Sequence, residues 1–181
     1  SNGSNSNSNS NSNSNSNSNS TDVEAEAAHG LSVDKRYSKS GFEQFFKKTK
    51  KDGKTTFSAK TGKSIDFLDE TRIGDYSAKI ATILQNIKES KGIIFIYSQF
   101  IWGGVVPLAL ALEYNGYSKY DGSILECDTK KPPLQKKTHD GVNYNPKYII
   151  ISGDKDLSNK AYENYLKIEN ENRDGSKVQI I

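Results

Sequence analysis

The feature that most constrains the fold is an apolar run at residues 92–100, with the sequence GIIFIYSQF. A run this dense in β-branched and aromatic residues is typical of a strand buried on both faces, as the strands of parallel sheets are. Ser98 and Gln99 follow at the carboxyl end of the strand, where open α/β sheets place their ligands. We therefore expect a buried strand over 93–97 and a functional site directly after it.

Helical patterns flank this strand on both sides. Ser77 can cap a helix in which apolar residues recur at 80, 83, 84 and 87, the spacing of one helix face. Residues 105–114 are apolar almost throughout, and Pro107 suits a first helical turn. The chain should therefore run from helix to strand to helix.

The same alternation returns later in the chain. A second apolar run at 148–151 ends in Ser152-Gly153-Asp154, a helical pattern spans 157–168, and a β-type run follows at 178–180. Alternation of this kind predicts a parallel sheet covered by helices. We expect strands 93–97, 148–151 and 178–180 to be neighbours in one parallel sheet.

Composition divides the chain into three parts. Residues 1–20 contain only Ser, Asn and one Gly, which predicts a disordered low-complexity linker. Residues 21–74 are polar, with short aromatic islands, and we interpret them as a connecting segment. Residues 75–181 form the α/β domain, with an insertion over about 117–146. Because the chain has no methionine and stops within an apolar run, we expect a fragment of a longer protein, truncated at both ends.

Cysteine usage and hydropathy limit the class of protein. A single cysteine, Cys127, cannot form an internal disulfide, and neither it nor His139 has partners at the spacing of a zinc site. No signal peptide or membrane-spanning run is visible, so we expect a soluble, intracellular protein without a membrane partner. The net charge of +3 permits contact with nucleic acid but does not demonstrate it.

Two lysine-bearing segments invite a phosphate-binding interpretation. Residues 60–64, KTGKS, end like the G-x-x-x-x-G-K-[ST] loop, but Phe57 stands where the first glycine belongs and no buried strand is expected before the loop. We therefore interpret it as a solvated turn. In the insertion, Lys130, Lys131, Lys136 and Lys137 can meet phosphate or can simply be solvated surface.

The motifs together resemble a known family. The stretches YSAKI at 76–80, IFIYSQF at 94–100, SGD at 152–154 and VQII at 178–181 resemble the second RecA-like domain of superfamily 2 helicases. More narrowly, they are similar to the helicase and early-transcription-factor-like ATPases of large nucleocytoplasmic DNA viruses, with residues 94–117 at helicase motif IV. The resemblance covers about 74–181 and implies an incomplete, three-layer αβα RecA-like domain with a mostly parallel sheet.

The resemblance also implies a function. In the family, ATP and magnesium bind between two RecA-like domains, but this chain shows no Walker A loop, DExH box or arginine-bearing motif VI. It should therefore hold no cofactor and be inactive alone, while the parent would be an ATP-dependent helicase of virion or infected-cell cytoplasm. Its partners would be the first RecA-like domain and a DNA or RNA backbone.

The resemblance places the two strand-end turns along the groove for the nucleic-acid backbone. The implied contact residues are Ser98, Gln99, Ser152, Gly153, Asp154 and Lys155. Hydroxyls, an amide and turn N–H groups donate well to phosphate oxygens. The alternative is that these serines and Gln99 only cap helices and satisfy their own turns. Trp102 is a candidate for stacking on bases, and Phe100 is expected to pack in the interior.

Two interpretations of the function remain open. The chain is either part of a nucleic-acid-dependent motor or a noncatalytic α/β nucleic-acid-binding or adaptor domain.

Overall fold

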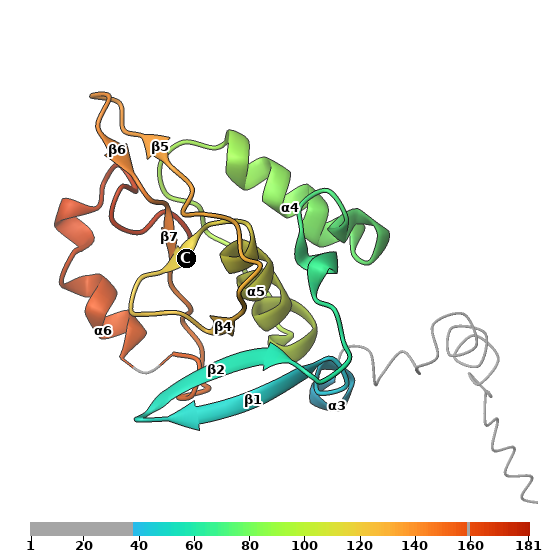
Figure 1. Cartoon of the computed structure of the whole chain (residues 1–181). Coiled ribbons are helices and arrows are strands. Elements are labelled where there is room, and N and C mark those ends of the chain that lie inside the picture. Colours follow the sequence, from blue (N-terminus) through green and yellow to red (C-terminus); the bar gives the residue numbers. More distant parts are fainter. Residues whose placement is uncertain (1–37, 159) are drawn as a thin grey trace, which may run out of the picture. The chain divides into compact units, whose positions relative to one another are not determined.

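The computed structural model describes residues 38–158 and 160–181, within one compact unit, Asp34–Ile181 (Figure 1). The predicted 1–20 linker and the first part of the 21–74 segment lie outside the described residues. The α-helices are α3 (Lys39–Phe42), α4 (Ala78–Glu89), α5 (Val106–Tyr114) and α6 (Ala161–Leu166). The 3₁₀ helices are Asp66–Leu68, Ile73–Asp75 and Glu169–Glu171, and Ile101–Val105 is a π-helical turn. The strands are β1 (Phe46–Lys51), β2 (Lys54–Ala59), β3 (Ser118–Lys119), β4 (Leu125–Glu126), β5 (Lys136–Lys137), β6 (Asn143–Tyr144) and β7 (Lys147–Tyr148).

The two predicted helices beside the first strand are confirmed. The Ser77 hydroxyl accepts a hydrogen bond from the Ile80 N–H at 3.3 Å and so caps α4, which buries Leu84 and Ile87. Gly92 follows α4 with a φ of +74°, a conformation that costs glycine little. Helix α5 carries Pro107 in its first turn and is buried along most of its length.

The three predicted strand segments lie side by side in parallel, as expected, but only Lys147–Tyr148 (β7) forms a strand, and the other two segments are joined through single bridges. Ile180 forms parallel bridges to both Ile94 and Tyr148, so residues 178–181 lie between the other two segments. The Ile94 N–H donates to the Gln179 carbonyl at 2.7 Å, and the Ile149 N–H donates to the Ile180 carbonyl at 2.9 Å. On the far side, β7 pairs in parallel with β3. The fold is therefore of mixed α/β class, built from short strands.

An irregularity in the central segment keeps these pairings short. The N–H groups of Gln179 and Ile180 both donate to the Lys147 carbonyl, at 2.8 and 3.1 Å. Gln179 and Ile180 therefore both lie opposite Lys147, as in a β-bulge, and side chains no longer alternate regularly between the two faces of the sheet. Val178 packs with Ile149 on one face, whereas Ile180 packs into the main core on the other.

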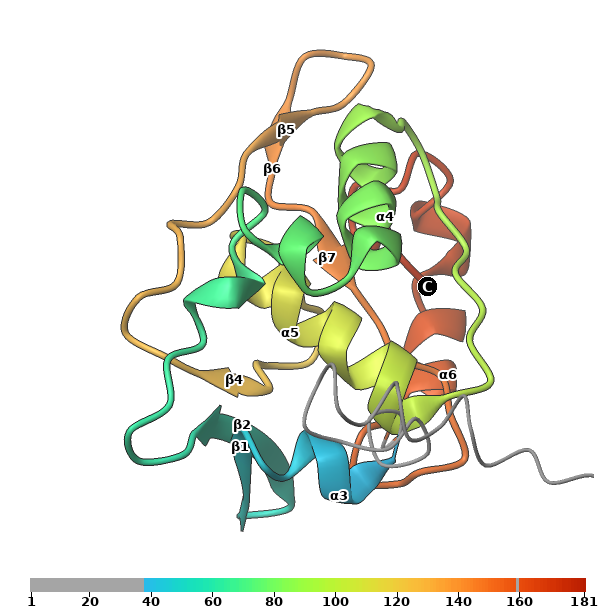
Figure 2. The ribbon, with the colours of Figure 1, turned by 90° about the vertical axis from the view of Figure 1, so that its right-hand side faces the viewer.

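Helices cover the strands on two sides. Leu84 of α4 and Leu110 of α5 share one hydrophobic core with Tyr148, Ile150 and Ile180. Ala161 of α6 instead packs with Ile149 and Val178. Figure 1 shows β7 between α6 and the α4–α5 pair, and Figure 2 shows the molecule turned by 90°, with α4 and α5 toward the viewer. The order helix, strand, helix across the molecule agrees with the α/β pattern of the sequence.

The prediction that 93–97 is buried on both faces is wrong. Ile94 and Ile96 pack against the core, but Phe95 is 74% and Tyr97 80% exposed. The reason is that this segment forms no strand and has a neighbour on one side only, through the bridge at Ile94, and it lies outside the cluster of Ile149, Val178 and Ala161 that α6 covers. An apolar run cannot reveal this, because its composition is the same whether a helix covers its outer face or not.

Solubility should improve when the outer face of this edge strand is made polar. The double variant Phe95→Ser/Tyr97→Ser should leave the unfolding free energy within about 0.5 kcal/mol of the parent, because exposed substitutions cost little. Its soluble yield should rise, because an exposed apolar edge promotes association. The matched control Ile96→Ser, on the core face, should destabilise by about 2 kcal/mol. Equal destabilisation in urea titrations would show that both faces are buried.

Residues 38–74 do more than connect. Strands β1 and β2 form an antiparallel hairpin, and β2 pairs in parallel with β4 through Phe57 and Leu125. Since β4 lies within the 117–146 insertion, segments that the sequence analysis separated share one three-stranded sheet. The apolar side chains that this part of the chain buries are Phe42, Phe46, Phe57, Ile65, Leu68 and Ile73.

A buried carboxylate joins α5 to the insertion and to β7. Glu113 is 4% exposed and accepts hydrogen bonds from the Tyr148 hydroxyl at 2.8 Å and from the N–H groups of Ile124 and Leu125, both at 2.9 Å. The Ser123 hydroxyl also donates to it. Burial, and then the neighbouring Glu113, raises the pKa of Tyr148 well above its usual value. In the sequence, the signal for this network is a lone glutamate in an otherwise apolar helix.

Removing this carboxylate should be costly. Glu113→Ala leaves three buried donors, Ile124, Leu125 and Tyr148, without their acceptor, so we expect a loss of about 3 kcal/mol in unfolding free energy. The control Tyr148→Phe removes only one donor and should cost about 1 kcal/mol. Urea denaturation measures both. Equal, small losses would mean that water replaces the carboxylate and that the network is not needed.

Candidate nucleic-acid interface

The two predicted turns lie at the same edge of the strands. Ser98-Gln99 follows the edge strand, and Ser152 to Lys155 follows the 147–150 segment. Both segments are parallel to 178–181, which lies between them, so their carboxyl ends point the same way. Two strand spacings separate the turns, about 10 Å. The structure therefore brings the two groups of predicted residues to one side of the domain.

In the first turn, the Ser98 side chain forms hydrogen bonds within the turn itself. The Ser98 hydroxyl donates to the Phe100 carbonyl at 3.1 Å and accepts from the Phe100 N–H at 3.2 Å. A Cβ at Gly104 would lie 2.3 Å from this hydroxyl oxygen, so the close approach requires glycine. Gln99 is exposed and can reach a ligand. The expectation that Phe100 packs in the interior is wrong, because it is 50% exposed.

The second turn has the same division of roles. The Ser152 hydroxyl accepts from the Asp154 N–H at 3.2 Å, and an Asp154 carboxylate oxygen accepts from the Asp156 N–H at 2.9 Å. Ser152 and Asp154 therefore hold the turn, as the alternative interpretation has it. Gly153 and Lys155 are exposed. Together with Gln99, they are the predicted residues most open to a ligand.

One lysine links the β1–β2 hairpin to both turns. The Lys48 ammonium lies 2.8 Å from an Asp156 carboxylate oxygen, and it lies 5.7 Å from the centre of the Trp102 ring. Lys50 pairs with the other Asp156 oxygen at 2.6 Å. Because Asp156 adjoins the second turn and Trp102 the first, the hairpin is held against both. The sequence analysis did not find this arrangement, since 108 residues separate Lys48 from Asp156.

Trp102 is engaged by neighbouring side chains. Its ring centre lies 5.6 Å from that of Phe42 and 6.2 Å from that of Phe57. The ammonium groups of Lys39 and Lys48 lie 5.6 and 5.7 Å from it. Such contacts favour packing and cation–π attraction over stacking on a base.

The ion pairs of Asp156 should make stability depend on acid pH. Hydrogen bonds from Lys48 and then Lys50 lower the pKa of Asp156 to about 2, from an ordinary value of 3.8. A lowered pKa means that the stabilisation is complete above about pH 4 and is lost as the pH falls toward 2. The thermal midpoint of the parent should therefore fall further between pH 4 and pH 2 than that of Asp156→Asn. Parallel curves would show that the pairs add no net stability.

The lysines of the insertion are turned toward the protein. Lys130 donates to the Leu125 carbonyl at 2.8 Å, and Lys136 donates to the Ile87 carbonyl at 2.7 Å. Burial lowers the pKa of Lys136. Lys131 pairs with Asp69 and Glu70, at 3.1 and 3.2 Å. These contacts favour a structural role for three of the four lysines over phosphate binding.

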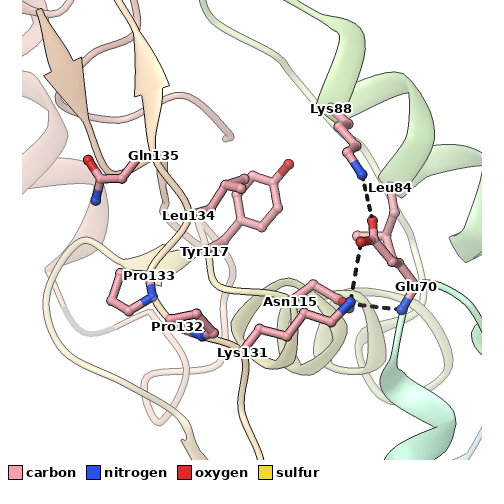
Figure 3. Close-up of a pocket in the computed structure, with 10 residues that line it drawn as sticks. All are labelled: Glu70, Leu84, Lys88, Asn115, Tyr117, Lys131, Pro132, Pro133, Leu134 and Gln135. Carbon is pink, nitrogen blue, oxygen red and sulfur yellow. Dashed lines mark hydrogen bonds and ion pairs between the residues drawn. The ribbon is translucent and has the colours of Figure 1, made fainter.

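The pocket in Figure 3, about 260 Å³ in volume, lies beside Lys131. Glu70 stands between Lys88 and Lys131, each at 3.2 Å. Burial raises the pKa of Glu70, but the two lysines outweigh it and hold the pKa below its usual value. Burial also raises the pKa of Tyr117, on the pocket wall, to about 12. These ion pairs join α4 and the insertion to the segment that carries Glu70, so the charges of this pocket have a structural role.

The 60–64 loop does not have the structure of a loop that binds the phosphates of a nucleoside triphosphate. Contrary to expectation, a strand with buried side chains, β2, precedes it directly. The chain after it forms only the three-residue 3₁₀ helix Asp66–Leu68, so no long helix presents its N-terminus to phosphate. Within residues 38–158 and 160–181, no group of three or more His, Cys, Asp or Glu is placed to hold a metal ion.

Comparisons with known proteins add no relative. No family model matches the chain, and no curated protein or solved structure matches it significantly. The helicase resemblance therefore stays a prediction. In the described part of the chain, no helix has the length and apolar character needed to cross a membrane.

Proposed function

We propose that this chain contributes the nucleic-acid-backbone-binding part of a nucleic-acid-dependent ATPase, as the second RecA-like domain of a superfamily 2 helicase does. The observation that carries the proposal is the junction at Lys48, which joins the basic hairpin to the turns after two parallel strands. Exposed Gln99, Gly153 and Lys155 then lie near a source of positive charge. Neutral donors and lysines together suit phosphate oxygens and carry no sequence information.

In this proposal the chemistry of ATP belongs to the whole protein. A first RecA-like domain would supply the phosphate loop and the magnesium carboxylate, and the two domains would hold ATP between them. The residues described here hold and orient the nucleic-acid strand. The viral helicase and early-transcription-factor-like ATPases are the group whose motifs the sequence most resembles.

A noncatalytic nucleic-acid-binding or adaptor domain is the second candidate function. The observation that favours it is the 60–64 loop, which leads into a short 3₁₀ helix instead of a phosphate-binding helix. Both candidates share the backbone-binding surface, and they differ in whether nucleic acid stimulates ATP hydrolysis by the whole protein.

The two exposed side chains of the turns should affect binding differently. Lys155→Ala removes a charge, so the slope of log affinity against log salt should flatten by about 0.7 for a single strand. Gln99→Ala removes a neutral donor and should cost on the order of 1 kcal/mol, with the slope unchanged. Fluorescence anisotropy of a labelled oligonucleotide at several salt concentrations measures both quantities.

Lys91→Ala, at an exposed position before the edge strand, is the matched control. It lies at the opposite end of that strand and should leave the slope as it is in the parent. If Lys155→Ala and Gln99→Ala bind like the parent at every salt concentration, the turns are purely structural and the proposed function is wrong.

A further inference from the structure

Positive charge is concentrated in and around the β1–β2 hairpin. Residues 46–63 contain seven lysines and one acidic residue, Asp52, whereas the whole chain has a net charge of only +3. The remainder of the chain is therefore net acidic. The lysines of such a segment repel one another unless an anionic partner binds to them.

The two faces of the hairpin treat their lysines differently. On the inner face, Phe46 and Phe57 are buried, and Lys48 and Lys50 pair with Asp156. The outer face carries Lys47, Lys51 and Lys54, all exposed. None of these three forms an ion pair with any residue in 38–158 or 160–181. The outer face therefore carries three lysines without an ion pair, and the one carboxylate beside them in the sheet, Glu126, accepts a hydrogen bond from Thr56 at 2.7 Å.

This arrangement costs stability and needs a reason. Lys51 and Lys54 are direct cross-strand partners, and like charges in that position repel. Lysines on an edge strand can guard against aggregation, and β1 is such a strand. That role does not account for Lys54, because β2 is the middle strand of its sheet. A bound polyanion would relieve the repulsion on both strands.

We propose that the outer face of the β1–β2 hairpin binds the phosphate backbone of nucleic acid and extends the surface formed by the strand-end turns. The proposal rests on the proposed function for its choice of ligand. Lys48, on the inner face, holds the hairpin beside both turns, so the lysines of the outer face belong to an element that is anchored next to them. The six residues of β1 span about 20 Å, long enough to contact several consecutive phosphates of one strand.

The chemistry of the face determines what it can read. Besides its lysines, it presents the hydroxyls of Thr49 and Ser58, which donate to phosphate. Arg, Asn and Gln, whose planar groups pair most specifically with base edges, do not occur in residues 46–59. The hairpin therefore binds without sequence preference. It also exposes no large apolar side chain to insert into a lipid surface, since Phe46 and Phe57 are buried.

The test compares two triple variants of the full chain. Lys47→Gln/Lys51→Gln/Lys54→Gln removes the outer-face charge, and Lys79→Gln/Lys91→Gln/Lys167→Gln removes the same charge from exposed positions elsewhere. Binding of a labelled single-stranded oligonucleotide is measured by fluorescence anisotropy over about a twentyfold range of salt concentration, from about 0.05 to about 1 M. The hairpin variant should lose about 2 from the salt slope and about 100-fold in affinity near 0.1 M salt. The control variant should match the parent in binding and in thermal midpoint. The hairpin variant should melt no lower than the parent, because it loses the repulsion between Lys51 and Lys54.

The outcomes separate this proposal from the proposed function. If the hairpin variant binds like the parent while Lys155→Ala does not, the hairpin proposal is overturned and the turns remain the site. If only the hairpin variant loses affinity, the hairpin proposal stands and the turns are structural. Equal losses in both triple variants would reduce the effect to net charge and overturn it. Binding to anionic lipid vesicles, with no binding of the oligonucleotide by the parent, would overturn both proposals.

Discussion

The structure depends on one short segment, residues 178–181, which hydrogen-bonds to a parallel neighbour on each side. The Ile181 N–H donates to the Ile94 carbonyl at 2.8 Å, and the Ile180 carbonyl accepts from the Ile149 N–H at 2.9 Å. Each such bond contributes only about 1 kcal/mol net. Their consequence for geometry is larger, because they align two strands that are more than 50 residues apart in the chain. The two strand-end turns share one edge for this reason.

Polar contacts then attach the irregular parts of the chain to this centre. Glu113 gathers four donors from the insertion and from β7, and a carboxylate buried in this way persists only when its oxygens are satisfied. Lys131 joins the insertion to Asp69 and Glu70, and Lys136 reaches the end of α4. The insertion is thus held by hydrogen bonds and ion pairs together with the burial of Tyr117, Ile124 and Leu125 in the main core.

The same contacts decide where charge is available to a ligand. Three lysines of the insertion are committed to protein partners, as are the inner-face lysines of the hairpin. The outer face of the hairpin and Lys155 carry exposed charge near the strand-end turns. Exposed lysines interact with phosphates through counterion release, which makes binding sensitive to salt and indifferent to sequence. The proposed nucleic-acid surface follows from this distribution and from the helicase resemblance.

Local patterns in the sequence determined the elements. The spacing of Ile80, Leu84 and Ile87 and the Ser77 cap predicted α4, and the apolar runs predicted the parallel neighbours, because helix and strand periodicity and capping are properties of adjacent residues. Only the tertiary structure decided which faces are covered and which charges are paired. Phe95 is exposed because α6 stops short of it, and Lys48 meets Asp156 because the hairpin folds back across the domain. Both depend on residues far apart in the chain, whose contact no local period encodes.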